Sequence, residues 1–207
     1  MPSAVSLRRL AGACGIITPV VAFSCIGTAL ALSPWFSWAE NALSDLGAAG
    51  PPVAPIFNDG LIMAGLLAVI FSLGLCQWTR KSLPEATGSL LILVSSACLA
   101  PIGAFPVGSE PIFAHTASAV GFFIISMLGR LILGASGLAR AGKGGALRRP
   151  LAALVLASGL LDLAVWVWWA LTRPELGLAV PEIIAASSIS TCLIALGLEI
   201  LRHPQVA

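Results

Sequence analysis

The chain has 207 residues, of which 58% are hydrophobic and only 10% are charged, against about 25% charged residues in an ordinary soluble domain. This composition excludes a typical water-soluble protein, and a net charge of +2 leaves no basic surface of the kind that binds nucleic acid. No polar segment is long enough to form a second unit, so residues 1–207 are expected to fold as a single membrane domain.

Six apolar runs follow one another along the chain, each close to the roughly 20 residues that a helix needs to cross a bilayer. They lie at about 11–32, 56–78, 86–105, 112–136, 150–172 and 179–201. Continuous runs of this length lack the alternating pattern of barrel strands, so they predict an all-α membrane protein, a bundle of six transmembrane helices. Proline opens the second, fourth and sixth runs at Pro55, Pro111 and Pro181, and this recurrence suggests three consecutive helical hairpins.

The charged residues alternate between the two ends of the predicted bundle. The basic ones are Arg8, Arg9, Arg80, Lys81, Arg140, Lys143, Arg148, Arg149 and Arg202, with Glu85 as one acid among them. The other gaps carry Glu40, Asp45, Asp59, Glu110, Glu175 and Glu182, with Arg173 as one basic residue. Because basic loops are retained in the cytoplasm, this pattern predicts a multi-pass protein of the cell membrane with both termini and the basic loops cytoplasmic. Arg130, inside the fourth run, is expected to extend its side chain to the cytoplasmic interface.

The longest exterior gap, residues 33–55, is rich in aromatic residues at its start. Trp35 and Trp38 suit the belt at the membrane surface, where an indole ring contacts both lipid and water. We therefore expect a short interfacial helix near residues 35–46, followed by an extended, proline-rich return to the membrane.

Polar side chains gather at the exterior ends of the predicted helices, where they form a candidate site. The candidate catalytic residues are Asp45, Asp59 and His115, and the candidate binding residues there are Asn41, Ser44, Asn58 and Glu110. Carboxylates and an imidazole on one rim can transfer protons or bind a lipid head group. Local roles are the alternative, because Asn58 or Asp59 can cap the second helix and His115 can be a hydrogen-bonded structural residue.

One further candidate binding residue, Asp162, stands near the centre of the fifth run. A charged Asp at the bilayer centre costs at least about 2.5–3.5 kcal/mol, so it is expected to face the protein interior and to have a function. The hydroxyl side chains at a similar depth are those of Ser95, Ser96, Ser190 and Thr191. They predict an interhelical hydrogen-bond cluster around the carboxyl group. A purely structural Asp162, protonated or hydrogen-bonded, is the alternative.

No metal site or cofactor is expected. The cysteines, Cys14, Cys25, Cys76, Cys98 and Cys192, all lie inside apolar runs and have no metal-ligand spacing. The two histidines, His115 and His203, fall at opposite ends of the predicted bundle, so a zinc site cannot readily be assembled. A hard cation held by Asp45, Asp59 and Glu110 stays open as an alternative.

Three motifs in the first four runs carry a family resemblance. The string Asn-Ala-Leu-Ser-Asp-Leu-Gly at 41–47, the segment 54–58 and the Phe105-Pro106 pair ahead of His115 resemble the uncharacterised prokaryotic membrane family called domain of unknown function 998 (DUF998). The last two runs match that family only in hydropathy. Its members are six-helix membrane proteins, so the resemblance implies the same architecture, and it implies no activity because none is established for the family.

Three hypotheses for the function follow. The first is an outward-facing polar pocket that binds or processes a lipid or amphiphile, which requires Asp45 and His115 to reach one cavity. The second is a proton or small-solute transporter that uses Asp162, which requires a wetted path to that carboxylate. The third is a structural or assembly protein without catalysis. Membrane lipids are the expected partners, with a lipid or small molecule as the ligand, and the sequence leaves open the substrate, any reaction and the oligomeric state.

Overall fold

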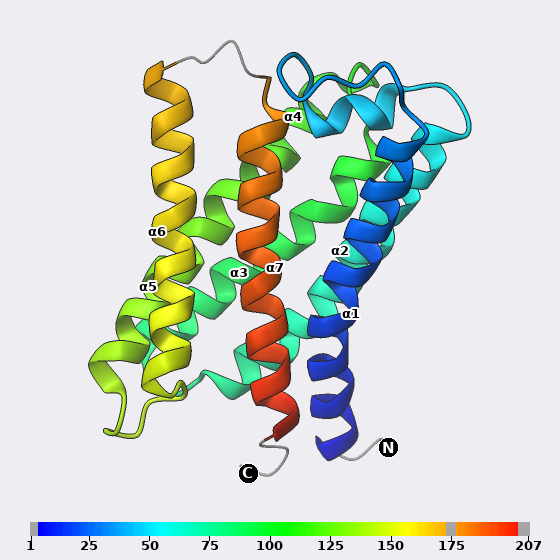
Figure 1. Ribbon diagram of the computed structural model, residues 1–207. Coiled ribbons are helices and arrows are strands. Elements are labelled where there is room, and N and C mark those ends of the chain that lie inside the picture. Colours follow the sequence, from blue (N-terminus) through cyan, green and yellow to red (C-terminus); the bar gives the residue numbers. More distant parts are fainter. Residues whose placement is uncertain (1–3, 173–176, 203–207) are drawn as a thin grey trace.

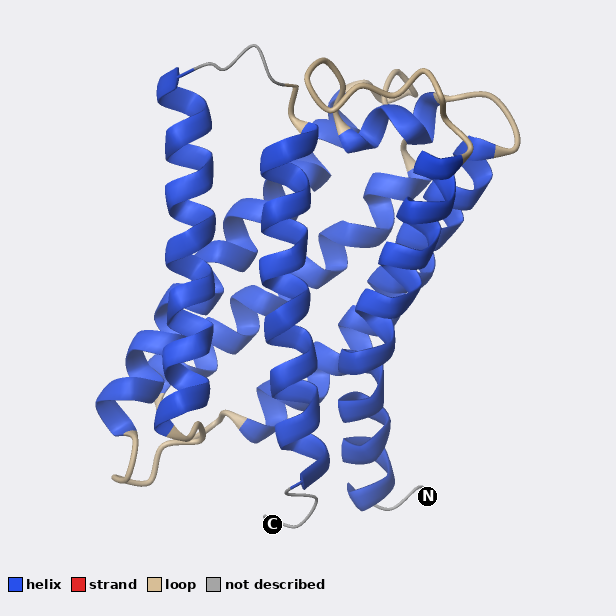
Figure 2. Ribbon diagram, viewed as in Figure 1, coloured by secondary structure: helices blue, strands red, loops and turns tan. Residues whose placement is uncertain are grey.

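The computed structural model describes residues 4–172 and 177–202, with side chains from residue 7 onward. Arg173, Glu175 and His203, which entered the charge and metal arguments, lie outside these residues. Figure 2 shows helices joined by loops and turns, with no strand in the described ranges. The all-α class expected from the continuous apolar runs is therefore confirmed.

Six membrane-length helices make up the described part of the fold, and one of them is built from three segments. The helices are α1 (Ala4–Ala31), α2 (Val53–Trp78), α3 (Leu83–Ala104), the continuous α4–η2–α5 (Phe113–Val120, Gly121–Ile125 and Ser126–Arg140), α6 (Arg149–Thr172) and α7 (Ala179–Arg202). Each is long and apolar enough to cross a membrane. They confirm the six predicted runs; the largest difference is at α1, which continues toward the N-terminus because Arg8 and Arg9 favour helix outside the apolar run.

The six helices form a closed ring in chain order. Each packs against the next, from α1 through α2, α3, α5 and α6 to α7, and α7 packs back against α1. The expected hairpins are present as neighbours within this ring. Figure 1 shows both described chain ends at the same end of the bundle, which we call the terminal end; the opposite end, with segments 32–52 and 105–112, we call the distal end.

Glycines allow close contact at two seams of the ring. A Cβ atom at Gly65 of α2 would lie 2.5 Å from the backbone nitrogen of Ala100 in α3. At Gly134 of α5 it would lie 2.4 Å from the backbone nitrogen of Leu156 in α6. Because lipid provides no hydrophobic force between helices, such backbone contact is a main source of packing energy in a membrane.

The distal loop differs from the expected interfacial helix near residues 35–46, and that prediction is wrong in position and type. The chain forms turns and then a short 3₁₀ helix, η1 (Leu43–Ala48). Asp45 fixes the turn, because its Oδ2 accepts hydrogen bonds from the Asn41 side-chain amide at 3.1 Å and from the Ala42 backbone N–H at 3.0 Å. Leu43 and Leu46 are buried, so η1 packs into the distal end of the ring instead of lying on its surface.

Candidate functional site

A cavity lies inside the helix ring and extends from η1 toward the middle of the bundle. Its empty volume is about 900 Å³, including space open to the outside. Helices α1, α2, α3, α4, η2, α5 and α7 contribute to its wall, and η1 contributes Leu43 and Ser44 at the distal end.

The wall of the cavity is mostly apolar. The large side chains that line it are Phe23, Ile26, Phe57, Leu61, Ile92, Leu99, Ile102, Phe122, Phe123, Ile189 and Leu193. Phe122 and Phe123 are consecutive, and both reach the cavity from η2, a π-helical turn that is wider than an α-helical turn. Such a wall accepts a hydrocarbon group and disfavours a bare polar solute.

The cavity is polar at its distal end, where Ser44, His115 and Glu182 line it. We call these three residues the distal rim. His115 Nδ1 lies 2.9 Å from the backbone oxygen of Phe105, and because a carbonyl can only accept, Nδ1 is the donor; in the neutral ring Nε2 is then the acceptor. The contact holds the imidazole of α4 against the end of α3.

Glu182 is the acidic member of the distal rim. Its side chain is 9% exposed, and its Oε2 accepts a hydrogen bond of 2.6 Å from the backbone N–H of Leu43. This contact holds η1 against α7, two segments far apart in the sequence. Oε1 has no hydrogen-bond partner among the described residues. Sequence reasoning missed Glu182 because it looked like an ordinary acid in a first helical turn, although it stands inside the sixth apolar run.

Asn41, Asp45 and Asn58 stabilise the distal loop instead of lining the cavity. Asn41 accepts a hydrogen bond from the Ser37 backbone N–H and donates one to Asp45. Asn58 of α2 donates from its side-chain amide to the backbone oxygen of Gly47 at 2.9 Å. The three side chains therefore shape the segment that covers the distal end of the cavity.

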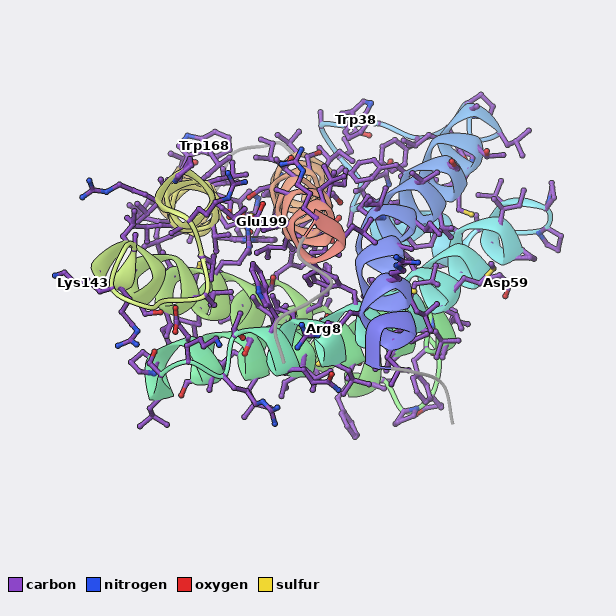
Figure 3. The ribbon with its side chains drawn as sticks, turned by 90° about the horizontal axis from the view of Figure 1, so that it is seen from below. Arg8, Trp38, Asp59, Lys143, Trp168 and Glu199 are labelled. Carbon is purple, nitrogen blue, oxygen red and sulfur yellow. The ribbon has the colours of Figure 1, made fainter. Side chains whose placement is uncertain are left out.

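Asp59 and Glu110 are exposed, and neither lines the cavity. Figure 3 shows Asp59 at the periphery of α2, pointing away from the bundle. The structure thus brings Ser44 and His115 to one cavity but does not bring Asp45 or Asp59 there with them. Proton transfer by Asp45, Asp59 and His115 stays a prediction. No group of three His, Cys, Asp or Glu side chains within the described residues is placed to hold a metal ion.

A second polar centre lies between α5, α6 and α7, where Arg130 forms an ion pair with Asp162. The prediction that Arg130 extends to the interface is wrong, because its side chain is only 1% exposed. Its guanidinium also donates to Ser188 Oγ of α7 at 3.0 Å and to the backbone oxygen of Ser126 at 3.3 Å. These acceptors and the carboxylate satisfy the charge inside the bundle, so the side chain has no need to reach water.

The predicted hydrogen-bond cluster around Asp162 exists but was assigned to the wrong residues. Ser188 takes the place expected for Ser190 and Thr191, and its hydroxyl donates to the backbone oxygen of Ser158 at 3.0 Å. Ser190 lines the cavity, and Thr191 is exposed. Matching depth does not fix the face of a helix, because each residue turns the side chain by about 100°.

The third helix does not join this cluster either. Ser96 instead shares a hydrogen bond of 2.8 Å with Ser72 of α2, and Ser95 donates to the backbone of its own helix. Asp162 keeps one oxygen, Oδ1, without a hydrogen-bond partner among the described residues. Asp162 does not line the cavity, so the distal rim and the ion pair are two separate centres.

A comparison with known protein families supports the resemblance that the sequence motifs indicated. A family model described as "protein of unknown function (DUF998)" matches residues 16–199. This range reaches into all six helices, including the last two, for which the sequence motifs gave no support. No curated protein and no solved structure matches the chain. The chain belongs to the DUF998 family.

Proposed function

We propose that this protein binds a single-chain amphiphile, with the hydrocarbon tail inside the cavity and the head group at the distal rim. The observation that carries the proposal is the polarity of the cavity described above. Its wall is mostly apolar, since hydroxyls such as those of Thr18, Ser95 and Ser96 donate to the backbone of their own helices, whereas Ser44, His115 and Glu182 stand at its distal end. An amphiphile has the same division between an apolar part and a polar end. Burial of its tail supplies the affinity, and the rim selects its head.

The length of the cavity supports a tail that spans one lipid leaflet. Along α7, lining residues run from Glu182 to Leu193, which is about 16 Å at the rise of an α-helix. Along the fourth span they run from His115 to Ser126, about 16 Å. Half of the hydrocarbon core is about 15 Å thick, so an acyl or alkyl chain from one leaflet fits this length.

The charge pattern supports a distal end that faces the outside of the cell. Lys143 and the other basic loop residues belong to the terminal end, where Figure 3 shows Lys143 pointing away from the bundle. By the positive-inside rule, the terminal end is then cytoplasmic and the protein resides in the cell membrane. The ligand would enter from the outer leaflet.

A pair of substitutions on α4 tests the proposal. Ala119 lines the cavity, whereas Ala117 lies on the exposed face of the same helix. Ala119→Phe is expected to fill the cavity, and Ala117→Phe is the matched control. Saturating tetradecanol should raise the unfolding midpoint of the wild type and of Ala117→Phe, because a ligand at about 100 times its Kd stabilises by about 2.7 kcal/mol.

The expected result is that tetradecanol gives Ala119→Phe no such rise, while its own midpoint without ligand stays near that of the control. An equal rise in both variants contradicts the proposal, since the tail would then bind somewhere other than the cavity. Tetradecanol that leaves the wild-type midpoint unchanged also contradicts it.

Transport through Asp162 is a second candidate function, and one observation favours it: the unpartnered oxygen Oδ1 of a fully buried carboxylate. Its other oxygen is held by Arg130, which is the arrangement of a structural ion pair. The conservative variant Asp162→Asn decides between the two roles. A loss of proton flux in reconstituted vesicles would support transport, and unchanged flux would remove its basis.

A further inference from the structure

We infer that the amphiphile bound by this protein carries a cationic amine head group, which Glu182 recognises. The inference rests on the proposed function and deepens it, because it names the chemical class of the ligand. It depends on how the buried carboxylates of the chain are neutralised.

Four carboxylates are buried in the described part of the chain, and three of them have an arginine partner. Asp162 pairs with Arg130, Glu199 with Arg148 and Glu85 with Arg140. Glu182 is the exception: its hydrogen-bond partner is the backbone N–H of Leu43. A buried carboxylate without an opposite charge is costly, so the fold has left a place for a positive charge at this residue.

That place is inside the cavity and not in a packed seam between helices. Glu182 lines the distal rim, and no lysine or arginine occurs among the residues that line the cavity. A positive charge that enters with a ligand can therefore reach the carboxylate. The charge of the ligand would then neutralise Glu182 as Arg130 neutralises Asp162.

The hydrogen-bonding capacity of the distal rim fits an ammonium group. A primary ammonium has three N–H donors and no acceptor. The rim offers acceptors: Oε1 of Glu182, Nε2 of His115 and the hydroxyl oxygen of Ser44. A carboxylate or phosphate head would instead place acceptors against acceptors and a negative charge beside Glu182.

The surroundings of the rim carry the same sign of charge. Asp45 is close enough to Glu182 to interact with it electrostatically. Glu40, Asp59 and Glu110 are further acids at the distal end, where the described residues include no lysine or arginine. A negative surface of this kind raises the local concentration of cations, so it favours entry of an amine over entry of an anion.

Four amphiphiles with the same tail test the inference on the wild-type protein. They are tetradecylamine, tetradecyltrimethylammonium, tetradecanol and tetradecanoate, each titrated while the unfolding midpoint is measured. Tetradecylamine is expected to bind at least about tenfold more tightly than tetradecanol, and tetradecanoate more weakly than either. Tetradecyltrimethylammonium, which has the charge without N–H donors, should fall between the amine and the alcohol.

Two variants then assign the preference to one residue. Glu182→Gln is expected to bring the affinity for the amine within about threefold of the affinity for the alcohol. Glu110→Gln removes an exposed distal charge of the same sign and should keep the wild-type preference. A preference that survives Glu182→Gln overturns the inference.

The outcomes also separate this inference from the proposed function. If all four amphiphiles bind the wild type equally, the cavity binds tails and the head-group inference is wrong. If none binds, the proposed function itself is wrong. The wild-type ranking needs no variant, so the inference stays testable even if Glu182→Gln fails to fold.

Discussion

The two buried carboxylates Asp162 and Glu182 are superficially alike, since each stands in an apolar run and is nearly removed from solvent. They differ in what surrounds them. Asp162 has an arginine from the neighbouring helix, whereas Glu182 has one backbone N–H and a cavity. A buried carboxylate that an arginine neutralises indicates a structural role, whereas one without a counter-charge at a cavity is a candidate for ligand binding.

The largest effect is expected when one member of the ion pair is removed. Asp162→Ala leaves Arg130 buried without a counter-charge, so the free energy of unfolding should fall by about 3–5 kcal/mol. The double variant Arg130→Met/Asp162→Leu should recover most of this loss because it removes both charges. Reversible unfolding in detergent measures each value. A cost below about 1 kcal/mol for Asp162→Ala would show that the pair does not stabilise the fold.

A much smaller effect on stability is expected at the distal rim. Glu182→Gln strands no opposite charge, and the side-chain oxygen of the glutamine can still accept the Leu43 N–H. The unfolding free energy without ligand should change by less than about 1 kcal/mol, in either direction. If the same unfolding measurement gave a cost as large as that of Asp162→Ala, the two carboxylates would both be structural and the contrast between them would fail.

Two serine substitutions compare the two faces of α7. Ser188→Ala removes an acceptor of Arg130 and a donor to Ser158, so a loss of about 1 kcal/mol is expected. Ser190→Ala is the matched control, because Ser190 lines the cavity on the same helix. The loss at Ser188 should shrink in the Asp162→Ala background, since the two residues belong to one network. Equal losses at Ser188 and Ser190 would mean that the ion pair gains nothing from Ser188.

Two exposed cysteine substitutions test which end of the bundle faces outward, and they are expected to change the stability least. Glu40→Cys and Lys143→Cys each place an exposed thiol, one at the distal end and one at the terminal end. In a background whose native cysteines are replaced by alanine, an impermeant thiol reagent added to intact cells should label the first and not the second. The reverse labelling would place the distal rim in the cytoplasm.

The helices could be predicted from the sequence because the length of an apolar run reports the thickness of the membrane directly. The faces of the helices could not, because a wholly apolar helix has little periodicity to show which side is inward. Ser188 and Ser190 lie in sequence surroundings of similar hydropathy. Ser188 nevertheless contacts the ion pair, whereas Ser190 lines the cavity. The partnership of Arg130 and Asp162 likewise depends on how α5 packs against α6.

The candidate site was predicted in part. Ser44 and His115 were found from their predicted exterior position, and the structure places both at one cavity. Asp45 and Asn58 were chosen for the same reason, but they stabilise the distal loop through contacts that a sequence does not reveal. Glu182 lies within the sixth apolar run, but Asp59 lies within the second in the same way and is exposed, so the sequence alone does not separate the two acids.

Photolabelling in native membranes tests whether an amine amphiphile occupies the cavity and is held there by Glu182. A tetradecylamine with a diazirine near the end of its tail would be activated by light, and the labelled peptides mapped by mass spectrometry. The account predicts adducts on cavity residues such as Ala119 and Leu193, suppressed by excess tetradecylamine but not by tetradecanoate, and strongly reduced in Glu182→Gln. Adducts confined to outward-facing residues such as Leu66 and Leu160, unaffected by competitor, would contradict it.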